Sequence, residues 1–223
     1  MTVTVDLEVL PDAELAALRV AALVAAGARH SVEERGAFSF AVSRDSAGTM
    51  LHALWDEEVP WEQITIYQVD ERVAPPGHPA RNLVQLMAEL PEEAVFDIRP
   101  MPVDDPRLEA AANRYAAELP EALDLVHLGL GEDGHTASLL PGNAVLEVRD
   151  RLVAVTGEFR GWQRMTLTYP ALDAAREIVW LVTGASKRDA LAKLLARDES
   201  IPATQVVTER QLVIADAAAA ARS

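Results

Sequence analysis

Short apolar segments alternate with helix-like segments along almost the whole of this chain. Apolar runs of about four to eight residues are typical of buried parallel strands, and longer amphipathic stretches separate them here. Such alternation builds βαβ units, in which parallel strands share one sheet and helices cover both of its faces. The sequence therefore predicts an α/β protein with a mainly parallel sheet. No stretch resembles a linker, so we expect residues 1–223 to form a single domain.

The boundaries of the expected elements follow from the apolar periodicity and from Pro, Gly and capping residues. Strands are expected at residues 2–9, 37–42, 64–69, 95–98, 125–130, 152–155, 165–167, 177–182 and 212–214, and helices at 11–30, 46–57, 83–90, 106–119, 171–175 and 186–197.

Charge and composition narrow the classes of function. The chain has 20 Lys and Arg against 35 Asp and Glu, a formal net charge of −15, and no cysteine. This balance disfavours nucleic acid as a partner, and the missing cysteines exclude a thiolate nucleophile and a cysteine zinc site. The N-terminal stretch does not read as a signal peptide, and the longest apolar run, 20–28, is short for a membrane span. We expect a soluble, cytoplasmic protein that acts on neither membranes nor nucleic acid; the sequence predicts no oligomeric state.

The stretch 124–142, DLVHLGLGEDGHTASLLPG, is the strongest candidate for a functional loop. A buried strand runs into a loop that contains three glycines, at positions 129, 131 and 134, together with Asp133, His135 and Ser138. Ligands of open α/β sheets bind outside the carboxyl ends of the strands, where this loop would emerge. A plain strand, turn and helix cap is the alternative reading, but a histidine among so many small and polar residues favours a site. His127, inside the apolar run, is expected to be a core residue.

Three more loops that follow strands carry polar clusters. The first, at 43–48, begins with Ser43 and Arg44 ahead of a helix and suits a phosphate, although an ordinary serine cap has the same pattern. The second holds Asp70 and Arg72 and continues to Arg81 and Asn82. The third places Lys187 in the first turn of a helix, where a cation opposes the helix dipole unless an anion is bound. Arg164, just before a strand, is a weaker candidate.

Motifs for metals and cofactors are missing from the sequence. The histidines have no ligand-like spacing, and there is no nucleophile elbow, P-loop or dinucleotide fingerprint. We therefore expect neither a metal nor a cofactor. A histidine, several carboxylates and grouped arginines and lysine suit general acid–base chemistry on a small phosphorylated substrate.

Four segments together resemble the 6-phosphogluconolactonase family. They are QVDERVAPPGHPARN, LDLVHLGLGEDGHTASLLPG, RMTLTYPAL and VTGASKRDAL, in the family's order and spacing, and the resemblance extends from about residue 38 to 202. It implies a Rossmann-like fold shared with glucosamine-6-phosphate deaminase and ribose-5-phosphate isomerase. The implied activity is hydrolysis of 6-phospho-D-glucono-1,5-lactone to 6-phosphogluconate in the oxidative pentose phosphate pathway, so the implied partner is a small phosphorylated sugar lactone.

The resemblance also implies roles for individual residues. His135 matches the general base that activates water, and Asp133 would orient His135 or the substrate hydroxyls. Arg72 would stabilise the oxyanion or the phosphate, and Asp70 would hold the loop or a sugar hydroxyl. The positions expected to hold the 6-phosphate are matched by Lys187 and Arg164.

The chain departs from the family at residues 43–48, where SRDSAG replaces an SGG-x-TP loop and Arg44 would replace backbone donors with a side chain. Two alternatives remain open. The first is an amino-sugar-phosphate deaminase or isomerase. Those deaminases carry an acidic residue five positions after the histidine, where this chain has Leu140, and an aromatic residue in place of Arg72. A non-catalytic sugar-phosphate-binding protein is the second alternative, because of the altered 43–48 loop.

Overall fold

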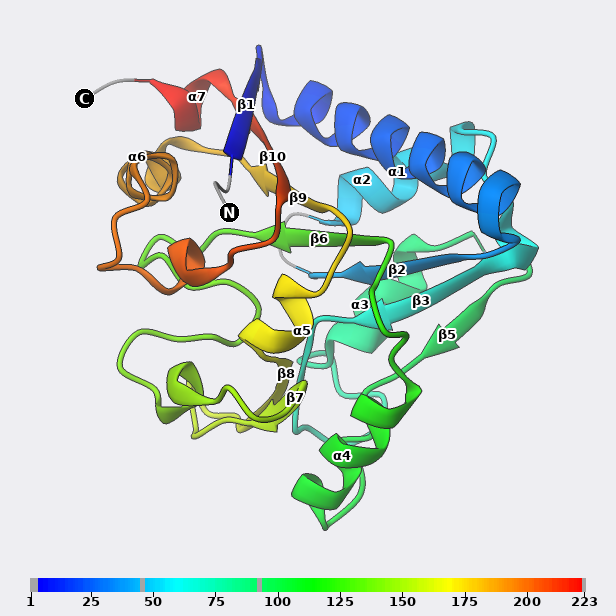
Figure 1. The fold of residues 1–223 in the computed structure, drawn as a ribbon, viewed down its shortest axis with the longest axis vertical. Helices are drawn as coiled ribbons and strands as arrows, with labels where there is room; N and C mark the ends of the chain where they lie inside the picture. The colour runs from blue at the N-terminus through cyan, green and yellow to red at the C-terminus, as the bar shows by residue number, and fades with distance from the viewer. Residues whose placement is uncertain (1–3, 45–46, 92–93, 222–223) are drawn as a thin grey trace.

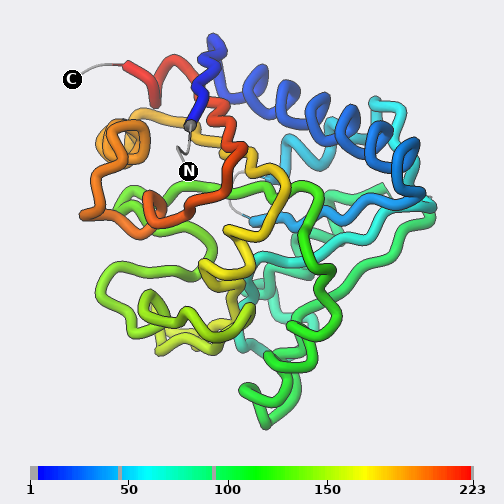
Figure 2. Tube along the Cα trace, viewed as in Figure 1, coloured from blue at the N-terminus to red at the C-terminus, as the bar shows by residue number. Residues whose placement is uncertain are grey.

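The computed structural model of the protein describes residues 4–44, 47–91 and 94–221, whose arrangement is shown in Figures 1 and 2. Its centre is a 7-stranded sheet in which all pairings are parallel. The strands, in their order across the sheet, are β1 (Thr4–Leu10), β10 (Arg210–Asp216), β9 (Ile178–Val182), β6 (Leu125–Gly129), β2 (Phe38–Val42), β3 (Ile64–Gln68) and β5 (Asp97–Arg99). The predicted α/β class with a mainly parallel sheet is confirmed.

Helices cover both faces of this sheet, as expected. The α-helices are α1 (Ala13–Arg35), α2 (Ala47–Ala53), α3 (Asn82–Glu89), α4 (Leu108–Glu118), α5 (Tyr169–Asp173), α6 (Arg188–Ala196) and α7 (Ala217–Ala220), and short 3-10 turns lie at Leu54–Asp56, Trp61–Gln63, Ala144–Glu147, Ala185–Lys187 and Pro202–Gln205. Alternate side chains of each strand enter two separate cores: Leu181 of β9 packs with α1, α2 and α3, and Trp180 packs with α4 and α6.

Helix α1 is long because of the connection that it makes. It joins β1, at the edge of the sheet, to β2, and β10, β9 and β6 lie between these two strands. Its 23 residues extend about 34 Å, enough to cross the roughly 19 Å between β1 and β2 obliquely. Among the described residues α1 is also the one helix with the length and apolarity to cross a membrane. Its small residues, such as Ala16, Val20 and Ala28, are buried on the sheet, which accounts for that composition.

A second sheet of 3 antiparallel strands differs from the sequence expectation. Its strands are β4 (Asp70–Arg72), β8 (Arg164–Leu167) and β7 (Val153–Val155), in the order β4-β8-β7. We expected residues 70–72 to be a loop, and this was wrong because they pair with β8, Asp70 opposite Thr166 and Arg72 opposite Arg164. Side chains of both sheets share one core. The single domain stays a prediction.

Other boundaries differ by a few residues. Strand β10 is longer than the predicted 212–214, because it pairs along its length with β1. Helix α1 continues to Arg35, where Gly36 adopts a positive φ of 79° and ends it. The expected helix start at Ser46, and Asp45 beside it, lie outside the described residues.

Candidate active site

The loops singled out in the sequence emerge at one edge of the sheet. Val42 of β2 is in register with His127 of β6, and Gly129 of β6 is in register with Leu181 of β9, so the carboxyl ends of these strands are adjacent. A narrow cleft lies at this edge, beside the second sheet. It is lined by Ser43, Arg44, Asp70, Arg72, Asn82, Gly129, Gly131, His135, Ala137 and Arg164. Seven of the residues predicted for the site therefore come together: Ser43, Arg44, Asp70, Arg72, Asn82, His135 and Arg164.

The loop after β6 folds into a tight turn that presents His135. The backbone N–H of Gly131 donates to the carbonyl of His135 at 2.8 Å, and the N–H of Gly134 donates to the carbonyl of Gly131 at 3.0 Å. Gly134 has a φ of +79°, and a Cβ atom there would lie 2.4 Å from Cβ of Ile201, so the turn requires glycine at that position. The Thr136 hydroxyl donates to the carbonyl of Gly129 at 2.9 Å and closes the turn against β6.

His135 and Asp133 form a hydrogen-bonded pair within this turn. His135 Nδ1 lies 2.5 Å from Asp133 Oδ1, and the His135 N–H also donates to that oxygen at 3.2 Å. Partial burial by itself raises the pKa of Asp133, but these hydrogen bonds outweigh it and hold the pKa of that carboxyl below its usual range. An ionised Asp133 accepts the Nδ1 proton, so Nε2 of a neutral His135 carries the lone pair of a general base. The expected orienting role of Asp133 therefore has a geometric basis.

Asp70 organises the opposite wall of the cleft. Its Oδ2 accepts from the Ser138 hydroxyl at 2.5 Å, and its Oδ1 accepts from Nδ2 of Asn82 at 2.9 Å. The guanidinium of Arg164 lies 3.8 Å from Asp70 Oδ2 and 3.4 Å from Ser138 Oγ. Asp70 thus ties together β4, α3, β8 and the His135 loop. Ser138, which stood in the candidate loop without an assigned role, is fully buried in this network.

Three arginines give the cleft its charge. Arg72 and Arg164 are cross-strand partners, and both side chains line the cleft with Arg44. Like charges directly opposite each other on a sheet are destabilising. The Arg72 guanidinium also donates to the carbonyl of Ala80 at 3.0 Å, which fixes its direction. In a chain of net charge −15, a cleft with three guanidinium groups is suited to an anionic ligand.

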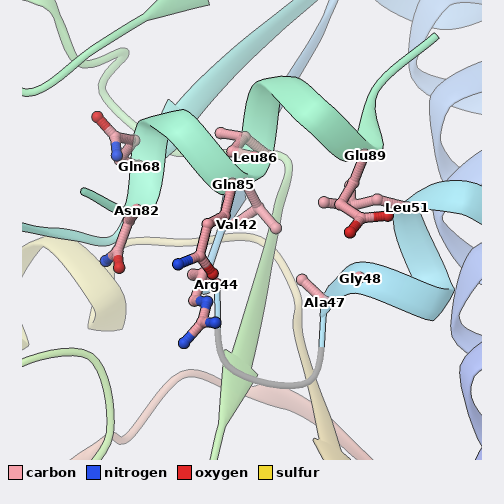
Figure 3. Close-up of a pocket in the computed structure, with 10 residues that line it drawn as sticks. All are labelled: Val42, Arg44, Ala47, Gly48, Leu51, Gln68, Asn82, Gln85, Leu86 and Glu89. Carbon is pink, nitrogen blue, oxygen red and sulfur yellow. The ribbon is translucent and has the colours of Figure 1, made fainter. Parts of the chain in front are cut away.

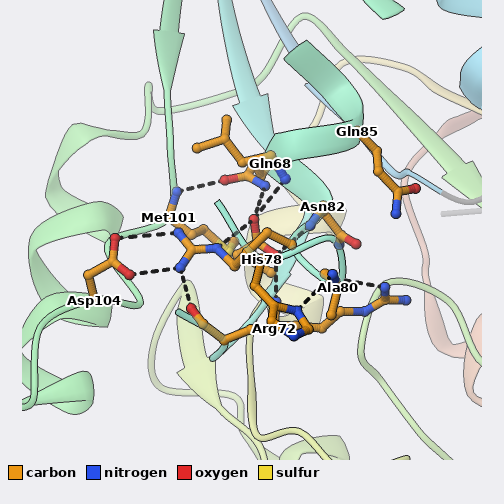
Figure 4. A network of polar contacts seen from close by, with 12 residues as sticks. Gln68, Arg72, His78, Ala80, Asn82, Gln85, Met101 and Asp104 are labelled. Atoms are coloured by element: carbon orange, nitrogen blue, oxygen red, sulfur yellow. Dashed lines mark hydrogen bonds and ion pairs between the residues drawn. The ribbon is translucent and has the colours of Figure 1, made fainter. Parts of the chain in front are cut away.

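Arg81, one of the loop residues that we expected to contact the substrate, lies in a buried network behind the cleft. Its guanidinium donates to the carbonyl of Ala74 at 2.7 Å and to Asp104 at 2.8 Å, and it lies 3.5 Å from Glu71. The fully buried Glu71 also accepts from the backbone N–H groups of Arg72, Asn82 and Leu83. Figure 4 shows this network, with Gln68, Met101 and Asp104 labelled; the backbone N–H of Met101 donates to Oε1 of Gln68 at 2.9 Å. The structure does not bring Arg81 to the cleft.

Lys187 follows β9 at the same edge of the sheet but is not among the residues that line the cleft. Its loop is held by Asp216, whose carboxylate accepts from the N–H of Gly184 at 3.0 Å. The phosphate-binding role of Lys187 stays a prediction.

Phe159 is a further neighbour of the site that the sequence did not indicate. It lies in a hairpin between β7 and β8, where Phe159 and Trp162 pair. Its ring contacts the His135 ring edge to face at 6.3 Å, and the Arg164 guanidinium stacks over it at 5.1 Å. A cation on an aromatic face is held by the ring quadrupole, so Phe159 helps to fix both side chains. An isolated aromatic residue in a loop carries no sequence signal for this role.

Within residues 4–44, 47–91 and 94–221, no three His, Asp or Glu side chains gather closely enough to hold a metal ion. The expectations of no metal and no cofactor stay predictions.

The fold, the histidine–aspartate pair and the arginine-lined cleft define an α/β protein with a site for general-base chemistry on a small anionic molecule. Residues 11–214 match the model of the family described as glucosamine-6-phosphate isomerases/6-phosphogluconolactonase, and the chain belongs to this family. It is 35% identical to the 6-phosphogluconolactonase of Nostoc sp., over 96% of each chain, and 34% identical to that of Synechocystis sp., over 93% of each. The crystal structure of a 6-phosphogluconolactonase from Shewanella baltica superposes with a TM-score of 0.84 and 23% identity, covering 96% of this chain and 97% of the other.

Proposed function

We propose that this protein hydrolyses 6-phospho-D-glucono-1,5-lactone to 6-phospho-D-gluconate, a step of the oxidative pentose phosphate pathway, in the cytoplasm. The proposal is supported by the similarity of the chain to 6-phosphogluconolactonases over almost their whole length. The observation that carries it in the structure is the His135–Asp133 pair at a cleft lined by three arginines. An ester carbonyl needs an activated water and a positive site for its oxyanion, and the two features supply these needs.

His135 acts as the general base in the first half of the reaction. With Nδ1 bonded to Asp133, Nε2 removes a proton from water, and the water oxygen attacks the lactone carbonyl. The negative charge moves to the carbonyl oxygen. When the tetrahedral intermediate collapses, the bond from the carbonyl carbon to the ring oxygen breaks, and that oxygen takes a proton from the His135 imidazolium. The products are the open-chain acid and an enzyme in its starting protonation state.

The arginines bind two anionic groups, the developing oxyanion and the phosphate. Arg72 is held by the carbonyl of Ala80, and Arg164 by Asp70 and the ring of Phe159, so both guanidinium groups are oriented before a ligand arrives. Preoriented donors stabilise developing charge without reorganisation in the transition state. We assign Arg72 to the oxyanion, and Arg164 and Arg44 to the phosphate, with Ser43 beside them.

Two positions favour lactone hydrolysis over amino-sugar-phosphate deamination. Leu140 stands where the deaminases carry an acidic residue, and it is buried at 3% exposure. Arg72 replaces an aromatic residue and points its charge to the cleft. An apolar, buried side chain at position 140 can neither donate nor accept a proton.

Lactone decay in a coupled assay tests the function. Glucose-6-phosphate dehydrogenase generates the lactone in place, and its disappearance is followed with and without this protein. The lactone also hydrolyses by itself, so the rate must exceed the buffer blank and return to it with the His135→Ala variant. A folded wild-type protein that does not accelerate the decay would contradict the proposal and favour a sugar-phosphate-binding protein.

A further inference from the structure

A second cavity adjoins the arginine-lined cleft and extends beneath α3 (Figure 3). Arg44 and Asn82 line both spaces, so the two are neighbours. The cleft itself is narrow, with a volume of about 10 Å³. The cavity beneath α3 has a volume of about 270 Å³, near the lower end of small-ligand pockets at roughly 300 Å³. A carbohydrate whose anionic group reaches the arginines therefore has room for its carbon chain on this side.

One face of α3 forms a polar stripe along the cavity. Four residues of α3 line the cavity: Asn82, Gln85, Leu86 and Glu89. They occupy positions i, i+3, i+4 and i+7, which lie on one face of a helix. The stripe extends over about 10 Å, because each helical residue adds roughly 1.5 Å. Figure 3 shows Asn82 at one end of the cavity and Glu89 at the other. The stripe therefore presents amide and carboxylate groups to the cavity, where helices usually turn apolar side chains to the interior.

The polar groups of the stripe all offer hydrogen-bond acceptors. Nδ2 of Asn82 donates to the backbone carbonyl and to Oδ1 of Asp70. Oδ1 of Asn82 is buried and accepts from no donor among the described residues. Gln85 donates its amide N–H to the carbonyl of Pro79 at 2.8 Å, which leaves its oxygen as an acceptor. No hydrogen bond or ion pair joins the half-buried Glu89 carboxylate to another described residue. A buried acceptor without a donor is costly, and a ligand rich in hydroxyl groups would satisfy it.

We propose that the cavity beneath α3 is a polyol subsite. It binds the hydroxyl groups of a carbohydrate whose anionic group lies among Arg44, Arg72 and Arg164. Apolar side chains of Val42, Leu51 and Leu86 supply the floor for the carbon chain. The Glu89 carboxylate repels a phosphate from this cavity, so the subsite also sets the direction in which the ligand lies. The inference rests on the proposed function, since it takes the ligand to be a sugar acid or its lactone.

The subsite is tested by calorimetric titration with a series of three ligands that share an anionic group. Inorganic phosphate, glycerol 3-phosphate and 6-phosphogluconate carry increasing numbers of hydroxyl groups, so wild-type affinity should rise along the series. Glu89→Leu removes an acceptor and should weaken 6-phosphogluconate binding about tenfold while leaving phosphate binding unchanged. Glu89→Gln keeps an acceptor oxygen and should lose only about threefold. Ala88→Leu, at an exposed position one residue away, is the matched control and should bind all three ligands as wild type does.

A second variant tests the space rather than the hydrogen bonds. A Cβ atom built on Gly48 lies 3.5 Å from Glu89 Oε1, so the longer side chain of Gly48→Leu enters the cavity from α2. It should weaken 6-phosphogluconate binding and spare phosphate binding. Circular dichroism confirms that each variant is folded.

The outcomes separate the subsite from the proposed function. Equal losses for phosphate and 6-phosphogluconate, or unchanged 6-phosphogluconate affinity in both Glu89→Leu and Gly48→Leu, would overturn the subsite. A wild-type protein that binds none of the three ligands would overturn it too. If wild-type affinity rises along the series but the protein does not hydrolyse the lactone, the proposed function is overturned and the subsite is retained.

Discussion

Gly131 lies so close to His135 that no side chain fits between them. A Cβ atom at Gly131 would be 2.1 Å from His135 Nδ1 and 2.6 Å from Asp133 Oδ1, far inside contact distance. The backbone of the loop that follows β6 therefore forms the surface against which the histidine–aspartate pair rests. The glycine is required here for its lack of a side chain, because its φ lies outside the left-handed region.

The first prediction is that Gly131→Ala inactivates the protein without unfolding it. The added methyl group displaces the imidazole. A displacement of a catalytic group by about 1 Å can lower the rate roughly 100-fold. We expect kcat to fall at least about 100-fold, with a thermal midpoint within a few degrees of wild type. Gly142→Ala is the control: its φ is +73° with open space around it, so it should cost about 1 kcal/mol of stability and leave kcat intact. Full activity of Gly131→Ala would show that the pair can move.

The second prediction concerns Asp133. If it fixes the tautomer of His135, Asp133→Asn should lower kcat by about 100- to 10,000-fold and change KM little, because the pair acts mainly in the transition state. His135→Ala should abolish catalysis with the fold intact. Steady-state kinetics on both variants gives the comparison. If Asp133→Asn changes KM and leaves kcat unchanged, Asp133 binds the substrate hydroxyls instead.

The sequence predicted those parts of the fold and site that depend on local periodicity. Apolar runs such as 125–130 and 177–182 indicated buried strands, and parallel strands necessarily bring their carboxyl ends to one edge. For that reason Ser43, Asp70, Asn82 and His135 could be grouped without a structure. The separation of the two core faces along β9 follows from the same alternation.

What escaped prediction depends on contacts between distant segments. Residues 70–72 are too few to signal a strand, and only pairing with β8 makes them one. Arg81 and Asn82 are adjacent in sequence, yet Asn82 turns toward Asp70 and Arg81 toward Asp104. Phe159 reaches His135 through a hairpin whose direction local sequence does not determine.

The third prediction ranks two cations that the family resemblance assigns to the phosphate. Arg164 lines the cleft and Lys187 does not. Arg164→Ala removes a buried guanidinium, so we expect KM to rise by about 100-fold or more, with some loss of stability because Asp70 loses its charged neighbour. Lys187→Ala should raise KM by about tenfold or less and leave kcat unchanged, because a phosphate is bound equally in ground and transition states. A larger KM effect from Lys187→Ala would reverse the ranking, and a selective loss of kcat would contradict a phosphate role for Lys187.

The last prediction uses two aspartates whose pKa values shift in opposite directions. Burial raises the pKa of Asp173, against a hydrogen bond from the N–H of Val207 at 2.8 Å. A folded-state pKa above the unfolded value means that ionised Asp173 reduces stability, and that stability falls as the pH rises through this range. Asp173→Asn keeps the acceptor oxygen without the charge. It should therefore melt at a higher temperature than wild type near pH 7, with the difference closing below about pH 4.

Asp133→Asn should show the opposite sign in the same melting series. The pKa of Asp133 is lowered in the folded protein, so its carboxylate adds stability above the unfolded pKa, and this is lost as the pH falls through the folded pKa. The variant should be slightly less stable than wild type near pH 7, by a small amount because the side chain is 44% exposed, and equal to it in acid. Thermal midpoints from pH 3 to pH 7 measure both effects. Parallel curves for the two variants would contradict the assignment, since a general effect of removing negative charge from an acidic protein shifts both in the same direction.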